Sequence, residues 1–385
     1  MTALEKSTFV LSNARLVLED RVLEPGWTSI ADGRIAEIGE GGAPAGGLDL
    51  GGDFLIPGLV ELHTDHLEPH VSPRPAVEWH PLSAVLAYDA QIAASGITTV
   101  FDSLRLGRDE RKSVTADVSH RLGSVIDDAQ NRGLLRADHK THLRCEICSA
   151  DVAASLEAYM QCLPVHLISV MDHTPGERQF RDVEKFLVYY RGKAGMTEAE
   201  LQRFVEERHE LFRKFSVPNR RALVSLAKER EIPLASHDDT TLAHVEESIC
   251  DGVVIAEFPT TDEAAAASHA AGVAVLMGAP NLVRGGSHSG NVSTESLARR
   301  GTLDILSSDY VPASLIQAAF DLPKRVPGIS LPQALATVTT APARAVGLDD
   351  RGMLEIGRRA DLVHVHLSDA MPVVRRVWRE GRRVV

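Results

Sequence analysis

The sequence predicts an α/β protein: a distorted (β/α)8 TIM barrel with a small β-sandwich domain built from both termini. Eight apolar strand candidates alternate with helical segments over roughly 290 residues, which matches such a barrel in size and rhythm. Short alternating β-runs occupy both ends of the chain, and acids and histidines follow the strand candidates. A doubly wound open sheet is the runner-up, and the position of these polar residues favours the barrel.

The small domain is expected from residues 1–55 and 345–385. Near the N-terminus, the runs FVLSNARLVL and TSIADGRIAEIG are bounded by turn signals such as GEGGAPAGG. Near the C-terminus, DLVHVHL and PVVRRVWREGRRVV have the same character. We expect these two ends to share one sheet.

Residues 56–344 are expected to form the barrel. Its strand candidates are, in order, DFLIPGLVELH, GITTVFDSL, THLRCEI, VHLISVMD, IPLASHD, GVVIAEFP, GVAVLMGAP and LDILSSD. The segments between them, such as SAVLAYDAQIAASG and TDEAAAASHAAG, resemble helices that end in glycine.

Composition narrows the class of function. A formal charge of −12 argues against broad binding to nucleic acid or to anionic membranes, although a local basic pocket could hold a small anion. The N-terminal MTALEKSTFV lacks a basic region followed by an apolar core, so we expect no signal peptide, and no apolar stretch is long enough to predict a membrane span. The four cysteines are too scattered for a disulfide scaffold. We therefore expect a cytoplasmic protein.

The alternation of side chains along a strand brings the acids and histidines together. In GLVELHTD, the residues Leu59, Glu61, His63 and Asp65 share one face, while Val60 and Leu62 take the other. In THLRCEI, the same rule puts His142, Arg144 and Glu146 on one face and the apolar residues toward the helices. Because Cys145 and Cys148 face opposite ways, we interpret them as buried structural thiols.

Further strand ends supply VMDHTPG, ASHDDTT and LSSDYVP, with His173, His237 and Asp309 among their residues. Imidazole and carboxylate are ligands suited to zinc, manganese or iron, so the pattern predicts a divalent-metal site with one or two ions, zinc being favoured. An isolated histidine is more often a hydrogen-bonded structural residue. The joint placement of several at one end of a barrel reverses that expectation, because unpaired acids there would be expensive to desolvate.

These residues also carry a family resemblance. PGLVELHTD and GMLEIGRRADLVHVHL resemble motifs of the amidohydrolase superfamily, and the match covers essentially the whole chain. More narrowly, HTDHLEPH, HLRCEI, DHTPGERQFRD, SHDDTT, EFPTT, MGAPNLVRGGSHSGN and SSDYVP resemble, in order, a family of diphosphatases of the carbon-phosphorus lyase pathway. That family hydrolyses α-D-ribose 1-methylphosphonate 5-triphosphate to the 5-phosphate and pyrophosphate.

The resemblance implies a set of metal ligands, with Glu146 in the bridging place that a carboxylated lysine fills elsewhere in the superfamily. The two later histidines of the superfamily usually lie on strands five and six, but here they follow strands four and five. Asparagine commonly follows HTD in the narrower family, whereas this chain has His66, which we interpret as a hydrogen-bonding residue rather than a ligand. The implied ligands are His63, Asp65, Glu146, His173, His237 and Asp309.

Two stretches supply donors for phosphate. NLVRGGSHSGN combines Arg284 and the backbone of Gly285 and Gly286 with the side chains of Ser287, His288 and Ser289. Arg178 and Arg181 follow His173 in a long, helix-rich connection, residues 174–222, which we expect to form a lid over the active site. Asp309 is the predicted proton acceptor because it ends the last strand, and His288 is a second predicted catalytic residue.

Three functions remain open at this level. The first is hydrolysis of a ribose 5-triphosphate, and the second is amidohydrolase action on a C–N bond of an amide, an imide or a deaminase substrate, which needs fewer cationic donors. The third is a non-catalytic metal-binding protein. We expect a small anionic substrate, no nucleic acid, no membrane and a possible homo-oligomer.

Overall fold

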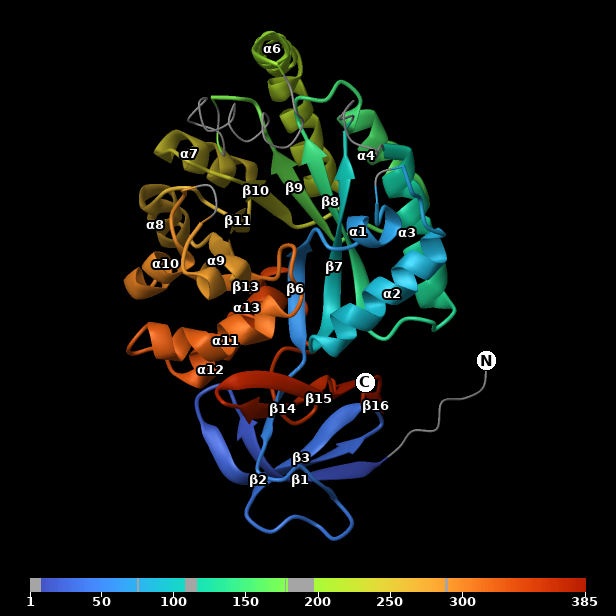
Figure 1. The fold of residues 1–385 in the computed structure, drawn as a ribbon, viewed down its shortest axis with the longest axis vertical. Helices are drawn as coiled ribbons and strands as arrows, with labels where there is room; N and C mark the ends of the chain where they lie inside the picture. The colour runs from blue at the N-terminus through green and yellow to red at the C-terminus, as the bar shows by residue number, and fades with distance from the viewer. Residues whose placement is uncertain (1–7, 75, 108–115, 177, 179–196, 288–289) are drawn as a thin grey trace.

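Two sheets organise the molecule, and the chain passes from the first to the second between β5 (Phe54–Pro57) and β6 (Leu59–Thr64) and returns to the first at β14 (Leu362–Ser368). The computed structural model describes residues 8–385 apart from 75, 108–115, 177, 179–196 and 288–289. In Figure 1 the barrel lies above and the sheet made by the two ends of the chain lies below it. None of the helices among the described residues has both the length and the apolar character needed to cross a membrane.

The lower sheet joins the N-terminal and C-terminal segments, as the sequence predicts. Its strand order is β16-β15-β14-β5-β1-β2-β3, and β4 pairs with β1. Most neighbouring strands are antiparallel, including β5 with β14. The strands are β1 (Phe9–Val17), β2 (Val22–Ala31), β3 (Arg34–Glu40), β4 (Leu48–Asp49), β5 (Phe54–Pro57), β14 (Leu362–Ser368), β15 (Met371–Arg379) and β16 (Arg382–Arg383).

The barrel contains eight parallel strands in simple sequential order, each in one of the eight predicted segments. An isolated bridge between Thr64 and Asp309 brings the first strand beside the last. The strands are β6 (Leu59–Thr64), β7 (Ile97–Leu106), β8 (Asp138–Glu146), β9 (Leu167–Met171), β10 (Leu234–His237), β11 (Ile255–Glu257), β12 (Ala274–Gly278) and β13 (Ile305–Ser307).

Helices surround the barrel and cover its outer face (Figure 1). A large cluster of buried side chains lies between the strands and these helices, and a second cluster fills the barrel interior with a residue from nearly every strand. The helices are α1 (Glu68–Val71), α2 (Pro81–Ala94), α3 (Ala116–Asn131), α4 (Val152–Cys162), α6 (Glu198–Glu229), α7 (Leu242–Asp251), α8 (Asp262–Ala270), α9 (Ala279–Arg284), α10 (Thr294–Arg300), α11 (Ser314–Arg325), α12 (Leu331–Ala336) and α13 (Thr340–Ala345).

One predicted strand is in fact two. DFLIPGLVELH contains β5, which belongs to the terminal sheet, and β6, which opens the barrel, with Gly58 between them. A Cβ atom at Gly58 would overlap the Thr98 side chain, so only glycine lets the chain pass this close to its neighbour. The residue boundaries proposed for the two domains remain a prediction.

The predicted lid is described only in part. Its residues 177 and 179–196 lie outside the described residues, whereas residues 198–222 belong to α6, a helix of 32 residues. A capping box at its start explains where it begins, because the Thr197 side chain accepts from Glu200 N and the Glu200 side chain bonds back to Thr197 N. In Figure 1, α6 rises beyond the ends toward which β7, β8 and β9 point.

A charged network is buried between α2 and the barrel strands. His139 on β8 lies between two carboxylates, with Nδ1 at 2.8 Å from Asp102 and Nε2 at 3.3 Å from Asp89. Burial works against a charge on this ring, but the two carboxylates outweigh it and raise the pKa of His139 to about 9. The protonated ring therefore joins α2 to the sheet at neutral pH.

This network predicts a pH-dependent contribution to stability. The pKa of His139 in the folded protein lies above its unfolded value of about 6.5, so its contribution is complete below pH 6.5 and is lost as the pH rises through about 9. Replacing His139 by glutamine should lower the free energy of unfolding by up to about 3 kcal/mol at pH 6. Denaturant unfolding from pH 6 to 9.5 should show this difference shrinking.

His269→Gln is the control, because His269 forms an exposed pair with Asp304 that is worth little. A difference between wild type and His139→Gln that stays constant across this pH range would contradict the ionic role.

Candidate metal centre

The barrel places the six predicted ligands at the carboxyl ends of its strands, an end that we call the mouth. His63 and His237 end β6 and β10, and their rings are stacked with centroids 5.5 Å apart. The ring of His173, which follows β9, is 5.6 Å from that of His237. The strand count made from the sequence is therefore confirmed, and the two later histidines do follow the fourth and fifth strands.

Two of the predicted acids come from opposite ends of the barrel segment. Asp65 N donates to Asp309 O over 2.8 Å, and Asp309 N donates to His63 O over 3.2 Å. These backbone bonds hold the end of β6 against the end of β13. Asp65 and Asp309 are thus neighbours although the chain between them forms the rest of the barrel.

A bulge in β6 changes the simple alternation expected for this strand. Three steps along β6, from Glu61 to Thr64, span only two steps along β7, so one extra residue is inserted. Val60 and Leu62, which precede the end of the bulge, pack in the barrel interior. The alternation predicted from the sequence put these two residues on the opposite face from His63. The bulge turns His63 inward as well, because a bulge resets which side the next residue faces.

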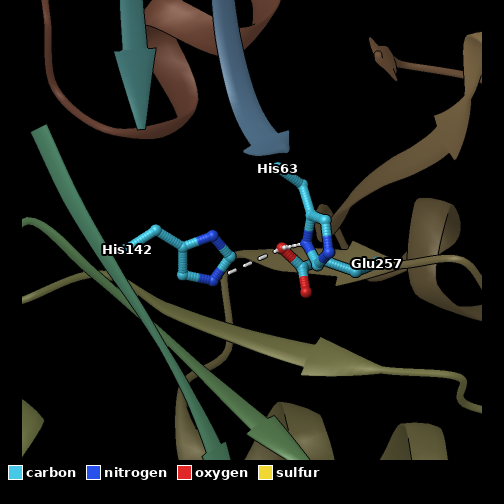
Figure 2. Close-up of side chains that lie close together, drawn as sticks. All are labelled: His63, His142 and Glu257. Atoms are coloured by element: carbon cyan, nitrogen blue, oxygen red, sulfur yellow. Dashed lines mark hydrogen bonds and ion pairs between the residues drawn. The ribbon is translucent and has the colours of Figure 1, made fainter. Parts of the chain in front are cut away.

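The buried carboxylate of Glu257 is the residue that links the histidines. Its Oε1 lies 2.9 Å from His63 Nδ1, and its Oε2 lies 3.0 Å from His237 Nδ1 and accepts from Ser169 Oγ over 2.7 Å. His142 approaches the same carboxylate from another side, at 3.7 Å (Figure 2). Glu257 was not among the predicted site residues, although its position at the end of a barrel strand, in EFPTT, was a signal for it.

These contacts orient the imidazole rings. In His63 and His237 the Nδ1–H group donates to Glu257, and in His173 it donates to Glu146 over 2.6 Å. In the neutral form of each ring this leaves a lone pair on Nε2, which is the arrangement found in histidines that bind metals. Burial opposes a charge on His63, but the Glu257 carboxylate outweighs it and raises the pKa of this ring, so a metal would have to displace a proton from it. Burial lowers the pKa of His237 to about 3, so this ring is neutral and its lone pair is available.

Two aspartates at the mouth carry raised pKa values. Burial raises the pKa of Asp238 to about 8, and burial together with the charge of Asp65 raises that of Asp309 to about 6. Asp238 Oδ2 is buried and lies 3.3 Å from His237 Nε2, but it accepts no hydrogen bond within the part of the chain that the structure describes. Both residues also have positive φ, 58° and 53°, which is unusual for aspartate and concentrates at functional sites.

This donor set fits a divalent cation. His173, His237 and Asp238 each offer a ligand atom within 4.8 Å of the others, and so do His63, His142 and Glu257. Buried acids that repel one another and an acceptor without a donor are the features that a cation would satisfy. Asp238 is therefore a candidate ligand, although only its neighbour His237 was among the ligands predicted from the sequence.

A third group, Glu146, Cys148 and Asp172, is less suited to a metal. Cys148 Sγ lies 3.3 Å from Asp172 Oδ1 and 3.2 Å from Thr174 Oγ1. Burial raises the pKa of this thiol far above its usual range, so it is protonated. Both cysteines of CEIC are buried and free, as predicted.

The predicted phosphate donors fall in three different settings. Arg284 is exposed at the end of α9, where Gly285 caps the helix in the left-handed conformation and Gly286 and Ser287 follow. Arg178 is buried and forms ion pairs with Asp239 and, at 3.1 Å, with Glu247, so its charge is already matched inside the protein. Arg181, His288 and Ser289 lie outside the described residues.

His66 and Arg144 complete the inner surroundings. His66 Nδ1 lies 3.2 Å from Tyr310 O, which is the hydrogen-bonding position favoured for this residue over a ligand role. The buried guanidinium of Arg144 contacts the Asp65 carboxylate, and together with the charge of His63 it outweighs the effect of burial, so the pKa of Asp65 lies well below its usual range. Asp65 is thus held as a carboxylate at the rim.

Known proteins resemble this chain in sequence and in fold. The model of the amidohydrolase family matches residues 90–385. The α-D-ribose 1-methylphosphonate 5-triphosphate diphosphatase of Escherichia coli (strain K12) is 46% identical, over 97% of this chain and 100% of the relative.

Two solved structures share the fold. One is N-acetyl-D-glucosamine-6-phosphate deacetylase from Mycobacterium smegmatis, with a TM-score of 0.65 and 18% identity over 98% of this chain and 100% of that one. The other is 5-methylcytosine deaminase from Klebsiella pneumoniae, with a TM-score of 0.66 and 16% identity over 98% of each chain.

The geometry predicts that Glu257→Gln weakens metal binding. A glutamine has only one acceptor oxygen for two Nδ1–H groups, so at least one imidazole loses the bond that orients it. We expect the affinity for zinc to fall about 10- to 100-fold, measured by competition with a chromophoric chelator. Glu263→Gln, an exposed change on the neighbouring helix α8, is the control. Wild-type affinity in a folded Glu257→Gln protein would show that the carboxylate does not orient the ligands.

Proposed function

This chain belongs to the amidohydrolase family, and from that premise we propose that it hydrolyses α-D-ribose 1-methylphosphonate 5-triphosphate to the 5-phosphate and pyrophosphate, using a divalent metal. The substrate is the one named for the Escherichia coli relative, which matches nearly the entire chain. The structural observation that carries the proposal is the convergence of oriented histidines and buried acids at one mouth.

The metal would be held by the residues whose free ligand atoms face the mouth. Zinc is the ion that this mixture of imidazole and carboxylate suits best, with manganese or iron as alternatives and one or two ions in total. When bound, such an ion acts as a Lewis acid and lowers the pKa of a water molecule. The ligand set is His63, Asp65, Glu146, His173, His237 and Asp309, with Asp238 as an additional candidate.

Asp309 is placed to take a proton from the attacking water. The residue follows β13 directly, and the backbone bonds to His63 and Asp65 fix it beside the other proposed ligands. A pKa of about 6, raised by burial and by Asp65, is closer to neutrality than that of an ordinary aspartate, as a general base requires. The water oxygen attacks the α-phosphorus, and the bond from that phosphorus to the bridging oxygen breaks.

Pyrophosphate leaves with the electron pair of that bond. The protein must therefore supply donors that stabilise the negative charge developing on the leaving pyrophosphate. The end of α9, which follows β12, offers Arg284, and the turn after it offers the backbone N–H groups of Gly285 and Gly286 and the Ser287 hydroxyl; a run of such donors suits a polyphosphate. His288 and Ser289 continue this stretch of sequence, and we propose His288 as a catalytic donor to the leaving oxygen.

Two substitutions test these roles. Asp309→Asn should lower kcat by about 100-fold or more because the proton acceptor is lost.

Arg284→Ala should chiefly raise KM, by about 10-fold, because a charge-assisted hydrogen bond to the triphosphate is lost. Both are measured by pyrophosphate release from the metal-loaded enzyme.

Asp349→Asn, a change at an exposed aspartate remote from the mouth, is the control. Normal kinetics in both test variants would overturn the assignments. Release of ammonia or a carboxylate from amide substrates, without pyrophosphate release from the triphosphate, would favour the alternative amidohydrolase activity.

A further inference from the structure

The side chain of Thr240, in the SHDDTT motif, joins the chain segments that follow β9 and β10. Its hydroxyl oxygen lies 3.0 Å from Arg178 O, beyond the end of β9, and also 3.0 Å from Asp238 O, directly after β10. The hydroxyl has one proton, so the two carbonyls share it. Only 3% of the Thr240 surface is exposed, so these bonds lie in the low-dielectric interior, where hydrogen bonds are strong.

A second threonine sets the direction of this hydroxyl. Thr260, in the EFPTT motif after β11, donates its own proton to Thr240 Oγ1 over 2.8 Å. The Thr240 proton must then point away from Thr260, toward the two carbonyls. Thr261 Oγ1 donates to Thr240 O over 2.9 Å, and Thr260 N donates to Asp239 O over the same distance. The loop after β11 therefore holds the loop after β10 through its backbone and through two threonine side chains.

Arg178 is attached to the loop after β10 by its side chain as well. Its buried guanidinium contacts the Asp239 carboxylate and lies 3.1 Å from Glu247 on α7. Asp239 also accepts from Ser248 Oγ over 3.0 Å, which fixes the carboxylate that Arg178 contacts. The sequence predicts that Arg178 binds phosphate, but here its guanidinium binds two acids of the protein and its carbonyl binds Thr240.

These contacts hold a strained residue of the metal centre. Asp238 has a φ of 58°, in the left-handed region, which an aspartate keeps only where the surrounding bonds impose it. Asp238 N donates to Glu257 O over 2.9 Å, and Asp238 O accepts from Thr240. In this conformation the Asp238 carboxylate lies within 4.8 Å of ligand atoms of His173 and His237.

We propose that Thr240 and Arg178 are positioning residues of the metal centre. They fix the segment beyond β9, where Arg178 follows His173 by five residues, against the turn that carries Asp238. They thereby set the separation of two ligands, His173 and Asp238, and neither is a ligand itself. The inference rests on the proposed function in that it takes a divalent cation to bind here, but it does not depend on which bond is hydrolysed.

Thr240→Val, which removes the hydroxyl and nearly keeps the size of the side chain, tests this role. The affinity for zinc, measured without substrate by competition with a chelator, should fall about 10-fold or more, as it does when groups that orient ligands are lost. Thr240→Ser keeps the hydroxyl and should bind zinc nearly as wild type does. Thr28→Val is the matched control, because it removes another buried hydroxyl that donates to a backbone carbonyl, Glu37 O, but in the terminal sheet.

The visible spectrum of the cobalt-substituted protein is a second readout, because its bands respond to the geometry around the ion. The bands should shift in Thr240→Val but not in Thr240→Ser or Thr28→Val. If Thr240→Val does not fold, Thr260→Val takes its place: it removes only the donor that directs the Thr240 hydroxyl and should weaken zinc binding about 5-fold. Wild-type zinc affinity in folded Thr240→Val, or in Thr260→Val where that variant takes its place, would overturn the proposal.

Arg178→Lys separates positioning from phosphate binding. Lysine keeps the charge but lacks the fork that holds Asp239 and Glu247 together, so zinc affinity should fall about 10-fold with no phosphate present. Unchanged zinc affinity together with weaker binding of pyrophosphate would overturn the positioning role of Arg178. If Thr240→Val weakens zinc binding but the wild-type enzyme releases no pyrophosphate from the triphosphate, the diphosphatase assignment fails and the positioning role stands.

Discussion

The closure of the barrel between β6 and β13 is the constraint on which the site depends. Glu61 is fully buried at this seam, and its two carboxylate oxygens accept from His63 N at 2.6 Å and from Ser308 N at 2.5 Å. The carboxylate thus joins β6 to the end of β13 and satisfies two buried backbone N–H groups. Without this closure, Asp309 would not lie beside His63 and Asp65, and no set of ligands drawn from the first and last strands could form.

Electrostatic balance explains why the interior tolerates so many ionisable groups. Glu257 accepts hydrogen bonds from both His63 and His237, and Glu146 accepts one from His173. Arg144 forms an ion pair with Asp65. These contacts give a hydrogen-bonding or ionic partner to buried groups whose desolvation without one would cost the most free energy. The histidine Nε2 atoms take no part in them and can still bind a metal. The pairs beneath the mouth set the direction of the ligands. Burial raises the pKa values of the remaining acids, Asp238 and Asp309, and a bound cation would favour their ionised forms.

Much of this could be predicted from the sequence, because strand periodicity and chain order are local properties. All eight barrel strands and the gathering of His63, His173 and His237 follow from patterns of apolar residues and the polar residues that end them. The bulge in β6 could not be predicted, since one extra residue leaves no mark on composition. Glu257 was missed because EFPTT reads as a strand end followed by a helix cap, and Thr261 does cap α8. The ion pairs that bury Arg178 involve Asp239 and Glu247, partners that only the folded chain brings near.

The pairing of β5 with β14 has a consequence for how the protein is made. β5 leads straight into β6, yet its partner on one side comes from residues 362–368, so the ribosome must have synthesised nearly the whole chain before that edge can be covered. During translation the barrel strands emerge in their spatial order and can associate one after another. Over the same period β5 has no β14 to pair with, so the backbone hydrogen-bonding groups on that edge stay exposed. Completion of the terminal sheet is therefore a late event in biogenesis. Premature termination near the C-terminus would leave β5 without its β14 partner, and this unpaired edge could then pair with a strand of another chain.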